Sequence, residues 1–487
     1  MKIIFKDFKI KEGRIDFKIE GDDLDGSEIY FDLSEDIIPS NDSIAYSIAT
    51  LAGEKYDKMI IEDLTVSPSV KKNIEEYASA TVTVEIGEEA PKKEKENFTL
   101  NFSGGFDSLA TYTLMPENTE LVYLEFGGDF EREVKFFKRF NPYRVKTNLV
   151  TEGFNRNTEE FMGIGTLLYS DYLNTGYTVF GTIMKPNYMF YVKNPNSDEN
   201  LYEAPFNYHG IKTVKYAQAL TEIGTAMVVS HHFPELVEDS FESLAPVGSE
   251  KYFRKGLILD TVNKKFNRNL NISPDFSHVK YKMKWGRSLN ADFISLYLIK
   301  NGCLDYLNKL YLHIPKEAIE FVDDLDLNLY ERVNTTFMEK TFPSKDALSK
   351  YLTKLNEAGV IPFTEKDYDE FRKVADFLDK YHYIYAHPKN EVTTDNPYLE
   401  GYINLNKSYL DLNNSYSELN NKNMALKKEH NALRKNYSDL HKEFIEFKKD
   451  HYQGIKNYEN EIENLNNIID SYRSRRVVKF ANSFKRS

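Results

Sequence analysis

The sequence predicts an α/β protein with a five-stranded parallel sheet, because two kinds of segment alternate regularly between residues 97 and 290. Short runs rich in β-branched and aromatic residues alternate there with longer runs that have helical periodicity. Such alternation is typical of parallel strands joined by helices that cover both faces of the sheet. The expected strands are residues 98–102, 121–126, 144–150, 177–183 and 226–230, and the expected helices are 108–115, 131–140, 158–173 and 212–223.

The flanking segments predict two further domains. Residues 1–90 fit a small α+β domain, and the charged stretch that follows, up to residue 97, marks its boundary. Residues 291–400 predict a mostly helical domain. The N-terminal strands are expected at residues 2–8, 14–19, 28–33, 59–66 and 80–86, with helices at 43–52 and 69–78, and the C-terminal helices at 291–300, 345–357 and 366–380.

A heptad repeat predicts a long coiled coil at residues 401–472. Leucine recurs every seven residues from Leu405 to Leu440, and a second series begins three positions earlier at Tyr402. The phase shifts by four residues before the repeat resumes at Ile455, which is a stutter. Asn423 in the second series favours a parallel homodimer. An antiparallel hairpin and a single exposed helix remain the alternatives.

The final segment, residues 473–487, predicts a basic amphipathic tail. It carries six arginines and lysines and no acid, while Val477, Phe480, Ala481 and Phe484 follow helical spacing. A helix of this kind fits an anionic membrane surface. A solvated tail that complements the helix dipole is the alternative interpretation.

Composition excludes some classes of function. The net charge of −13 argues against general nucleic-acid binding, since neutralising phosphates needs a basic surface. The single cysteine, Cys303, excludes a disulfide within the chain, and no window of 18 uncharged apolar residues is present. A signal-peptide pattern is also lacking, so we expect a cytoplasmic protein, peripheral at the inner face of the membrane if the tail binds there.

The most informative motif is Ser103-Gly104-Gly105-Phe106-Asp107-Ser108, which lies between the first expected strand and the first expected helix. A sharp turn through glycines directs backbone N–H groups and the positive end of a helix dipole at one point, which suits a phosphate. An incidental glycine turn is the alternative.

This hexapeptide resembles the pyrophosphate loop of the PP-loop ATP pyrophosphatases, which belong to the adenine-nucleotide alpha-hydrolase superfamily. The resemblance implies a Rossmann-like fold over residues 97–290, binding of ATP and Mg²⁺, and a role for Asp107 in catalysis and in holding the metal. Lys185 lies two residues past the fourth expected strand, at the same edge of the sheet, where it could balance the charge of the triphosphate; an ordinary surface lysine is the alternative. The adenine is expected beside Leu124, Glu125 and Phe126, and the phosphates beside Ser103, Gly104, Gly105, Phe106, Asp107 and Ser108.

Two features depart from the family pattern. The helix that follows the motif is expected to end at Pro116 after about two turns, which is short for a helix after a phosphate-binding loop. Because Cys303 stands alone, the cysteine cluster that binds zinc in some members cannot form, so no zinc is expected.

These residues predict an ATP-dependent ligase, similar to amidotransferases, that adenylates a carbonyl or carboxylate of a small substrate, releases pyrophosphate and then admits ammonia or an amine. The alternative is a catalytically inactive nucleotide-binding scaffold that oligomerises through its coiled coil. His231-His232 and the run Ser249–Lys255 are weaker candidates for substrate or phosphate contacts. For that run, a solvated helix face is the simpler interpretation.

Overall fold

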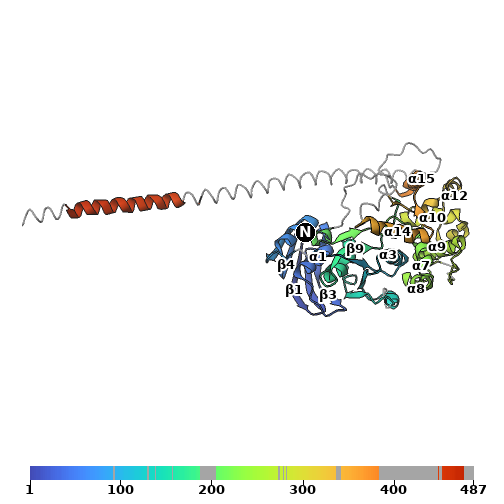
Figure 1. The fold of residues 1–487 in the computed structure, drawn as a ribbon, viewed down its shortest axis with the longest axis horizontal. Helices are drawn as coiled ribbons and strands as arrows, with labels where there is room; N and C mark the ends of the chain where they lie inside the picture. Colours follow the sequence, from blue (N-terminus) through green and yellow to red (C-terminus); the bar gives the residue numbers. More distant parts are fainter. Residues whose placement is uncertain are drawn as a thin grey trace, which may run out of the picture. The chain divides into compact units, whose positions relative to one another are not determined.

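The unit Met1–His387 is built around a ten-stranded mixed sheet, seen in Figure 1. The computed structural model describes residues 1–382, apart from 92–93, 129–130, 138, 156, 187–203, 273–274, 278, 281 and 336–341, and also 448 and 452–475. In spatial order the strands are β10 (Lys212–Val214), β9 (Thr175–Phe180), β6 (Asn97–Asn101), β7 (Glu120–Glu125), β8 (Tyr143–Thr147), β3 (Leu24–Leu33), β2 (Arg14–Gly21), β1 (Lys2–Lys11), β4 (Lys58–Val66) and β5 (Thr81–Ile86).

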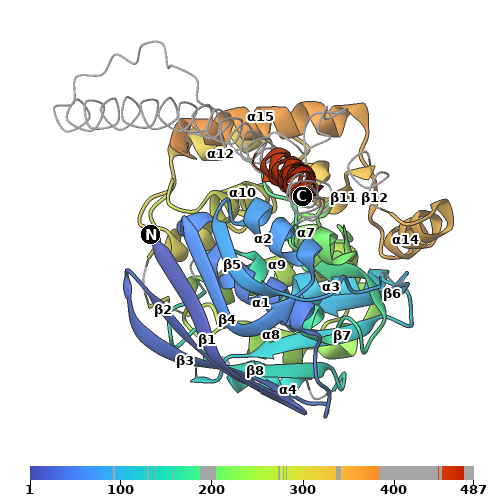
Figure 2. The same ribbon diagram turned by 90° about the vertical axis from the view of Figure 1, so that its left-hand side faces the viewer.

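Most neighbouring strands run parallel. Parallel pairing joins β10, β9, β6, β7 and β8 at one end of the sheet and β1, β4 and β5 at the other. Antiparallel pairing joins β8 to β3, β3 to β2 and β2 to β1, so the N-terminal strands meet the rest of the sheet where β3 lies beside β8 (Figure 2). That junction has three register pairs, Phe31↔Thr147, Asp32↔Lys146 and Leu33↔Val145.

The predicted α/β class and parallel strand arrangement are therefore confirmed, but the limit of five strands is wrong. Every predicted strand and helix of residues 1–90 is present, and these strands extend the same sheet across the β3–β8 junction. A strand at the edge of a sheet has unpaired N–H and C=O groups, so pairing two edges satisfies both. The sequence pattern of either edge gives no sign of its partner.

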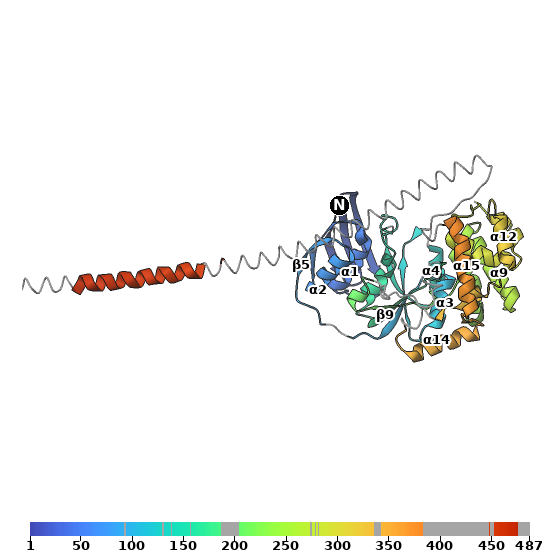
Figure 3. The same cartoon turned by 90° about the horizontal axis from the view of Figure 1, so that it is seen from above.

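Helices cover both faces of the sheet. Figures 1 and 3 show α1 (Asn41–Ala52) on one side of β9, and α3 (Phe106–Leu114) and α9 (Glu250–Phe266) on the other. Two buried apolar clusters result. One includes side chains of α3, α9, α7 (Glu222–His232) and α10 (Leu289–Lys300). The other joins the N-terminal strands to α1, α5 (Ile164–Tyr169) and buried valines of β7 and β8.

The remaining elements follow the predicted helical character of the C-terminal part. The predicted helices at 291–300, 345–357 and 366–380 are present as α10, α14 (Lys345–Glu357) and α15 (Glu365–His382). The same part of the described chain contains α11 (Leu304–Leu310) and α12 (Lys316–Asp323), and β11 (Arg332–Val333) pairs with β12 (Ile361–Pro362). Earlier in the chain lie α2 (Pro68–Tyr77), α4 (Glu131–Phe137) and α8 (Val237–Leu244).

Two neighbouring predictions were wrong in secondary-structure type: a predicted strand is helical, and a predicted helix contains a strand. Residues 226–230, predicted as the fifth strand, lie inside α7, while the predicted helix 212–223 contains β10 and only the start of α7. The Thr221 hydroxyl caps α7 by accepting hydrogen bonds from the N–H groups of Ile223 and Gly224. Residues 222–230 are all buried, so their apolar run lacks the periodicity that separates a helix from a strand.

A histidine network joins α1 to α5 on the face away from α3. His209 Nε2 lies 3.0 Å from Ser43 Oγ and 2.9 Å from Ser170 Oγ, and its ring packs against Tyr46. Burial lowers the pKa of His209 to about 4, helped by the Lys95 ammonium and opposed by Asp171.

In the second unit, Pro388–Ser487, residues 452–475 are helical. The predicted a and d residues after the stutter lie on this helix, and each is 44–69% exposed: Ile455, Tyr458, Ile462, Leu465, Ile469 and Tyr472. The heptads from Tyr402 to Phe447, with Asn423, and the tail beyond residue 475 lie outside the described residues. Over the part of the chain that is described, no helix combines the length and apolar character needed to cross a membrane.

Candidate functional site

The hexapeptide Ser103–Ser108 comprises the turn after β6 and the first three residues of α3. Gly104 has a φ of +70°, and a Cβ there would lie 2.8 Å from the Phe137 ring, so both conformation and space require glycine. The Ser103 N–H donates to Ser108 Oγ over 3.1 Å, and Ser240 Oγ donates to the Gly104 carbonyl over 3.0 Å. The turn is therefore held from inside and from α8.

The first turn of α3 is available to bind an anion. Gly105 is the N-cap residue, and among the described side chains none accepts a hydrogen bond from this end of the helix. The N–H groups of a first helical turn lack partners within the helix and favour negative charge. At the other end, Lys354 Nζ donates to the carbonyls of Thr113 and Met115, which stabilises the short helix before Pro116.

The turn lies at the point where the strand order of the parallel sheet reverses. From β6 the chain passes through α3 to β7 on one side, whereas β9, on the other side of β6, is followed by β10. Open α/β sheets bind ligands outside the carboxyl ends of strands at such a point. A Cβ on Gly181, just after β9, would lie 2.9 Å from Ser108 N and Cα, so the two chains meet there.

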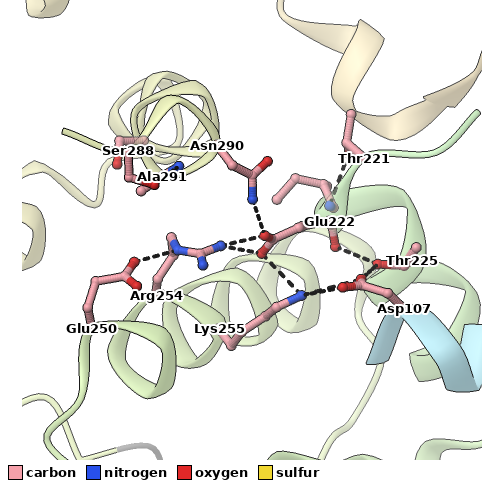
Figure 4. Close-up of polar contacts among 12 residues, drawn as sticks. Asp107, Thr221, Glu222, Thr225, Glu250, Arg254, Lys255, Ser288, Asn290 and Ala291 are labelled. Atoms are coloured by element: carbon pink, nitrogen blue, oxygen red, sulfur yellow. Dashed lines mark hydrogen bonds and ion pairs between the residues drawn. The ribbon is translucent and has the colours of Figure 1, made fainter. Parts of the chain in front are cut away.

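Asp107 connects the turn to two other helices, as Figure 4 shows. Thr225 of α7 donates its hydroxyl to Asp107 Oδ1 over 2.7 Å. Lys255 of α9 places its Nζ 3.3 Å from Oδ1 and 3.2 Å from Oδ2. The Asp107 side chain is 26% exposed, whereas that of Lys255 is 3% exposed. One carboxylate of the turn thus faces both solvent and a buried ammonium.

Glu222 of α7 is the centre of the buried part of this charged cluster. Arg254 Nη1 donates to both carboxylate oxygens of Glu222 over 2.5 Å, and Asn290 Nδ2 donates to Oε1 over 2.6 Å. Lys255 Nζ pairs with Oε2 at 3.1 Å. Burial alone would raise the pKa of Glu222, but the charges of Arg254 and Lys255 outweigh it and lower that pKa. Glu222 therefore stays ionised and fixes both cations.

The outer end of the cluster is Glu250, which lies one helical turn before Arg254. Arg254 Nε donates to Glu250 Oε1 over 2.6 Å. Burial alone would lower the pKa of the Arg254 guanidinium, but the carboxylates of Glu222 and Glu250 together raise it. Three carboxylates, those of Asp107, Glu222 and Glu250, therefore surround two cations (Figure 4). A third cation, Lys251, acts electrostatically on Asp107 from beyond ion-pair distance.

The expected adenine neighbours lie at the carboxyl end of β7. Leu124 and Phe126 pack against the apolar cluster of the α1 face, and Glu125 pairs with Lys146 over 3.4 Å. Gly127 and Gly128, which follow, both have positive φ, and a Cβ on either would meet nothing within 4 Å. The backbone after β7 therefore borders open space.

Lys185 is exposed and lies beyond the end of β9. Among the described residues it is Lys255, and not Lys185, that pairs with Asp107. His231 and His232 end α7, so they lie at the opposite end of that helix from Glu222 and Thr225. His232 Nε2 contacts the Lys354 carbonyl and His231 Nδ1 contacts Arg268, and neither histidine follows a strand as predicted.

Sequence reasoning missed Glu222, Thr225 and Asn290 and gave the run Ser249–Lys255 a solvated surface as its simpler interpretation. Arg254 and Lys255 are instead buried. A signal for Glu222 was present, since it is an isolated acid within an apolar run, and a buried acid requires a cation. The identity of that cation depends on contacts across more than 30 residues of sequence.

Asp107 is the carboxylate of this site that could hold a magnesium ion. Magnesium takes one or two protein carboxylates together with phosphate oxygens and water, and Asp107 presents a partly exposed carboxylate from the first turn of α3. Searched over the described residues, the protein has no group of three or more His, Cys, Asp or Glu side chains that could hold a metal.

Comparison with family models, curated proteins and solved structures returned no match to this chain.

Proposed function

We propose that this protein binds ATP with Mg²⁺ at Ser103–Ser108 and adenylates a carbonyl or carboxylate of a small substrate, as the resemblance to PP-loop ATP pyrophosphatases implies. The observation that carries the proposal is the uncapped first turn of α3, which contains Asp107, at the reversal of strand order. Backbone donors, a carboxylate for magnesium and a lysine are the groups that triphosphate chemistry requires.

The residues have distinct roles in this proposal. N–H groups of the turn and of α3 bind the phosphates, and Gly104 gives the turn its positive φ. Asp107 holds the metal, while Lys255, and Lys185 from the loop after β9, balance the charge of the leaving pyrophosphate. The base lies beside Leu124, Glu125 and Phe126, where Gly127 and Gly128 leave space.

The reaction follows from these positions. A substrate oxygen attacks the α-phosphorus, the bond to the bridging oxygen breaks, and pyrophosphate leaves with the electron pair. Ammonia or an amine then attacks the activated carbon and displaces AMP. The contribution of the protein is to position the reactants and stabilise charge, since the site offers donors and cations rather than a nucleophile of its own.

Calorimetry with ATP and MgCl₂ tests the binding step. We expect Asp107→Asn and Ser103→Ala each to weaken ATP binding, with roughly tenfold loss for Asp107→Asn, because a charge-assisted contact is worth about 1.4 kcal/mol or more. Asp346→Asn, an exposed carboxylate on α14, is the matched control and should bind as the wild type does. Equal affinities in all four proteins would contradict the proposal.

The products test the chemistry. In a panel of carboxylic acids and amines, ³¹P NMR should detect AMP and pyrophosphate. ADP and orthophosphate as the main products would refute adenylation. Binding of ATP with no turnover across the panel would favour the second candidate, an inactive nucleotide-binding scaffold.

The helix 452–475 supports an oligomeric form of either candidate. Its a and d side chains form an apolar stripe that is 44–69% exposed, and exposed apolar surface at heptad spacing is typical of a coiled-coil partner face. We therefore propose that a second copy of the chain covers this stripe in a parallel homodimer. Contact of the basic tail with an anionic membrane stays a prediction.

A further inference from the structure

Lys255 lies between two carboxylates that differ in how well they are neutralised (Figure 4). Its Nζ is 3.2 Å from Asp107 Oδ2 and 3.1 Å from Glu222 Oε2. The side chain is 3% exposed, so protein groups rather than water must satisfy its charge. The two contacts have nearly equal lengths. They differ in which other partners would neutralise each carboxylate if the lysine were absent.

Glu222 would retain a cation. Arg254 contacts both of its oxygens and Asn290 donates to one, and the Glu222 side chain is only 4% exposed. Asp107 would retain the Thr225 hydroxyl and the more distant charge of Lys251, which acts on it electrostatically without forming an ion pair among the described residues. The contact between Lys255 and Asp107 is therefore the one that another cation can replace.

We propose that Lys255 is a transferable cation: it neutralises Asp107 in the ligand-free protein and moves to the triphosphate when a divalent cation takes its place on Asp107. This inference rests on the proposed function and adds the order of charge exchange to it. The Glu222 carboxylate stays with Lys255 throughout as a fixed counter-charge. A lysine suits this role because its compact ammonium sits on a flexible four-carbon stem.

Transfer has a consequence that a purely structural lysine would not have. Without nucleotide, Lys255 competes with a divalent cation for Asp107, so removing the lysine strengthens metal binding. With nucleotide, Lys255 contributes an attractive contact to the phosphates, so removing it weakens nucleotide binding. The two affinities change in opposite directions.

Lys255→Met in the full chain tests this with two measurements. Mn²⁺ binding without nucleotide is followed by electron paramagnetic resonance, and ATP binding with MgCl₂ by calorimetry. We expect Mn²⁺ affinity to rise roughly fivefold and ATP affinity to fall roughly tenfold, the sizes expected for one charged contact. Lys264→Met on the same helix, whose lysine is 70% exposed, is the matched control and should leave both unchanged.

A second variant keeps the test valid if Lys255→Met does not fold. Lys255→Arg retains the charge and pairs with a carboxylate through two donors, so it should hold Asp107 more firmly and lower Mn²⁺ affinity below that of the wild type. An unchanged or higher Mn²⁺ affinity in Lys255→Arg would overturn the transfer.

Other outcomes separate this inference from the proposed function. Wild-type protein that binds no ATP would overturn the proposed function and with it transfer to a triphosphate. Wild-type protein that binds ATP, while Lys255→Met lowers both affinities or changes neither, would overturn the transfer alone.

Discussion

At the scale of single residues, the cost of burying charge explains the arrangement around Glu222. Taking a carboxylate and a guanidinium out of water costs several kcal/mol per ion, and their attraction regains that only with good geometry. Glu222 and Arg254 have such geometry, with both carboxylate oxygens at 2.5 Å from Nη1. The pair is thus better understood as a support that orients Lys255 than as a source of net stability.

His209 gives a prediction for the dependence of stability on pH. Burial lowers its pKa in the folded protein to about 4, below the ordinary value of 6.5. The unfolded chain therefore takes up the proton first, so the stability that the neutral ring contributes is complete above pH 6.5 and is lost as pH falls from 6.5 to 4. We expect the free energy of unfolding to decrease there by up to about 1.4 kcal/mol per pH unit from this residue.

Urea denaturation followed by circular dichroism at pH 7, 6, 5 and 4 measures that slope. His209→Gln should show a shallower slope than the wild type, while His313→Gln, at an exposed histidine, should retain the wild-type slope. Identical slopes in the wild type and His209→Gln would show that His209 is not the group responsible.

The sequence foresaw some site residues and missed others for a physical reason. Gly104 and Asp107 are encoded locally, because a glycine turn between a strand and a helix is a property of six consecutive residues. The contact between Asp107 and Lys255 joins residues 148 apart in the chain, and its existence depends on how α9 packs against α3 and α7. A single sequence does not encode such packing in any pattern that can be read from it.

At the scale of elements, the contact between the end of β9 and the start of α3 shapes the phosphate turn. A Cβ on Gly181 would lie 2.9 Å from two backbone atoms of Ser108, which cannot move aside as a flexible side chain can. Gly181→Ala should therefore displace the first turn of α3 and reduce ATP affinity roughly tenfold, with about 1–3 kcal/mol lost from the free energy of unfolding.

Calorimetry and urea denaturation check both effects. Gly454→Ala is the matched control, because a Cβ there meets nothing within 4 Å, and it should leave ATP binding unchanged. If Gly181→Ala bound ATP as tightly as the wild type, the turn would have to be more adaptable than this close contact indicates.

Elements were predicted well where their hydrophobic pattern was periodic and poorly where it was continuous. β1, β2 and β3 alternate buried and more exposed residues, so their presence was clear from the sequence, although β1 ends three residues later and β3 begins four residues earlier than predicted. α7 is buried along nearly its whole length, so its apolar run resembled a central strand of a parallel sheet. The cap at Thr221 was the local signal that could have corrected it.

At the scale of the whole molecule, the stripe on helix 452–475 predicts self-association of the full chain. Ile462 and Leu465 are 58% and 54% exposed and occupy an a and a d position. Replacing both with lysine should convert a dimer into a monomer, because like charges would meet in the buried seam. Light scattering with the full-length protein at tens of micromolar measures the mass.

Asn464→Lys adds one positive charge next to Leu465, outside the a and d series, and should leave the dimer intact. A wild-type protein that stays monomeric, or a double variant that stays dimeric, would contradict the heptad assignment for this helix.

The junction between β3 and β8 has a mechanical consequence. Three register pairs join the strands there, whereas β1 and β2 share seven. Further hydrogen bonds cross the junction, from Ser34 N–H to the Arg144 carbonyl over 3.0 Å and from Asn148 Nδ2 to the Glu28 carbonyl over 2.8 Å. Arg144 spans the line by pairing with Asp32 over 2.9 Å, and buried Phe31, Leu33 and Val145 pack across it. A shearing load between the two groups of strands is therefore carried by these side-chain contacts as well as by backbone hydrogen bonds.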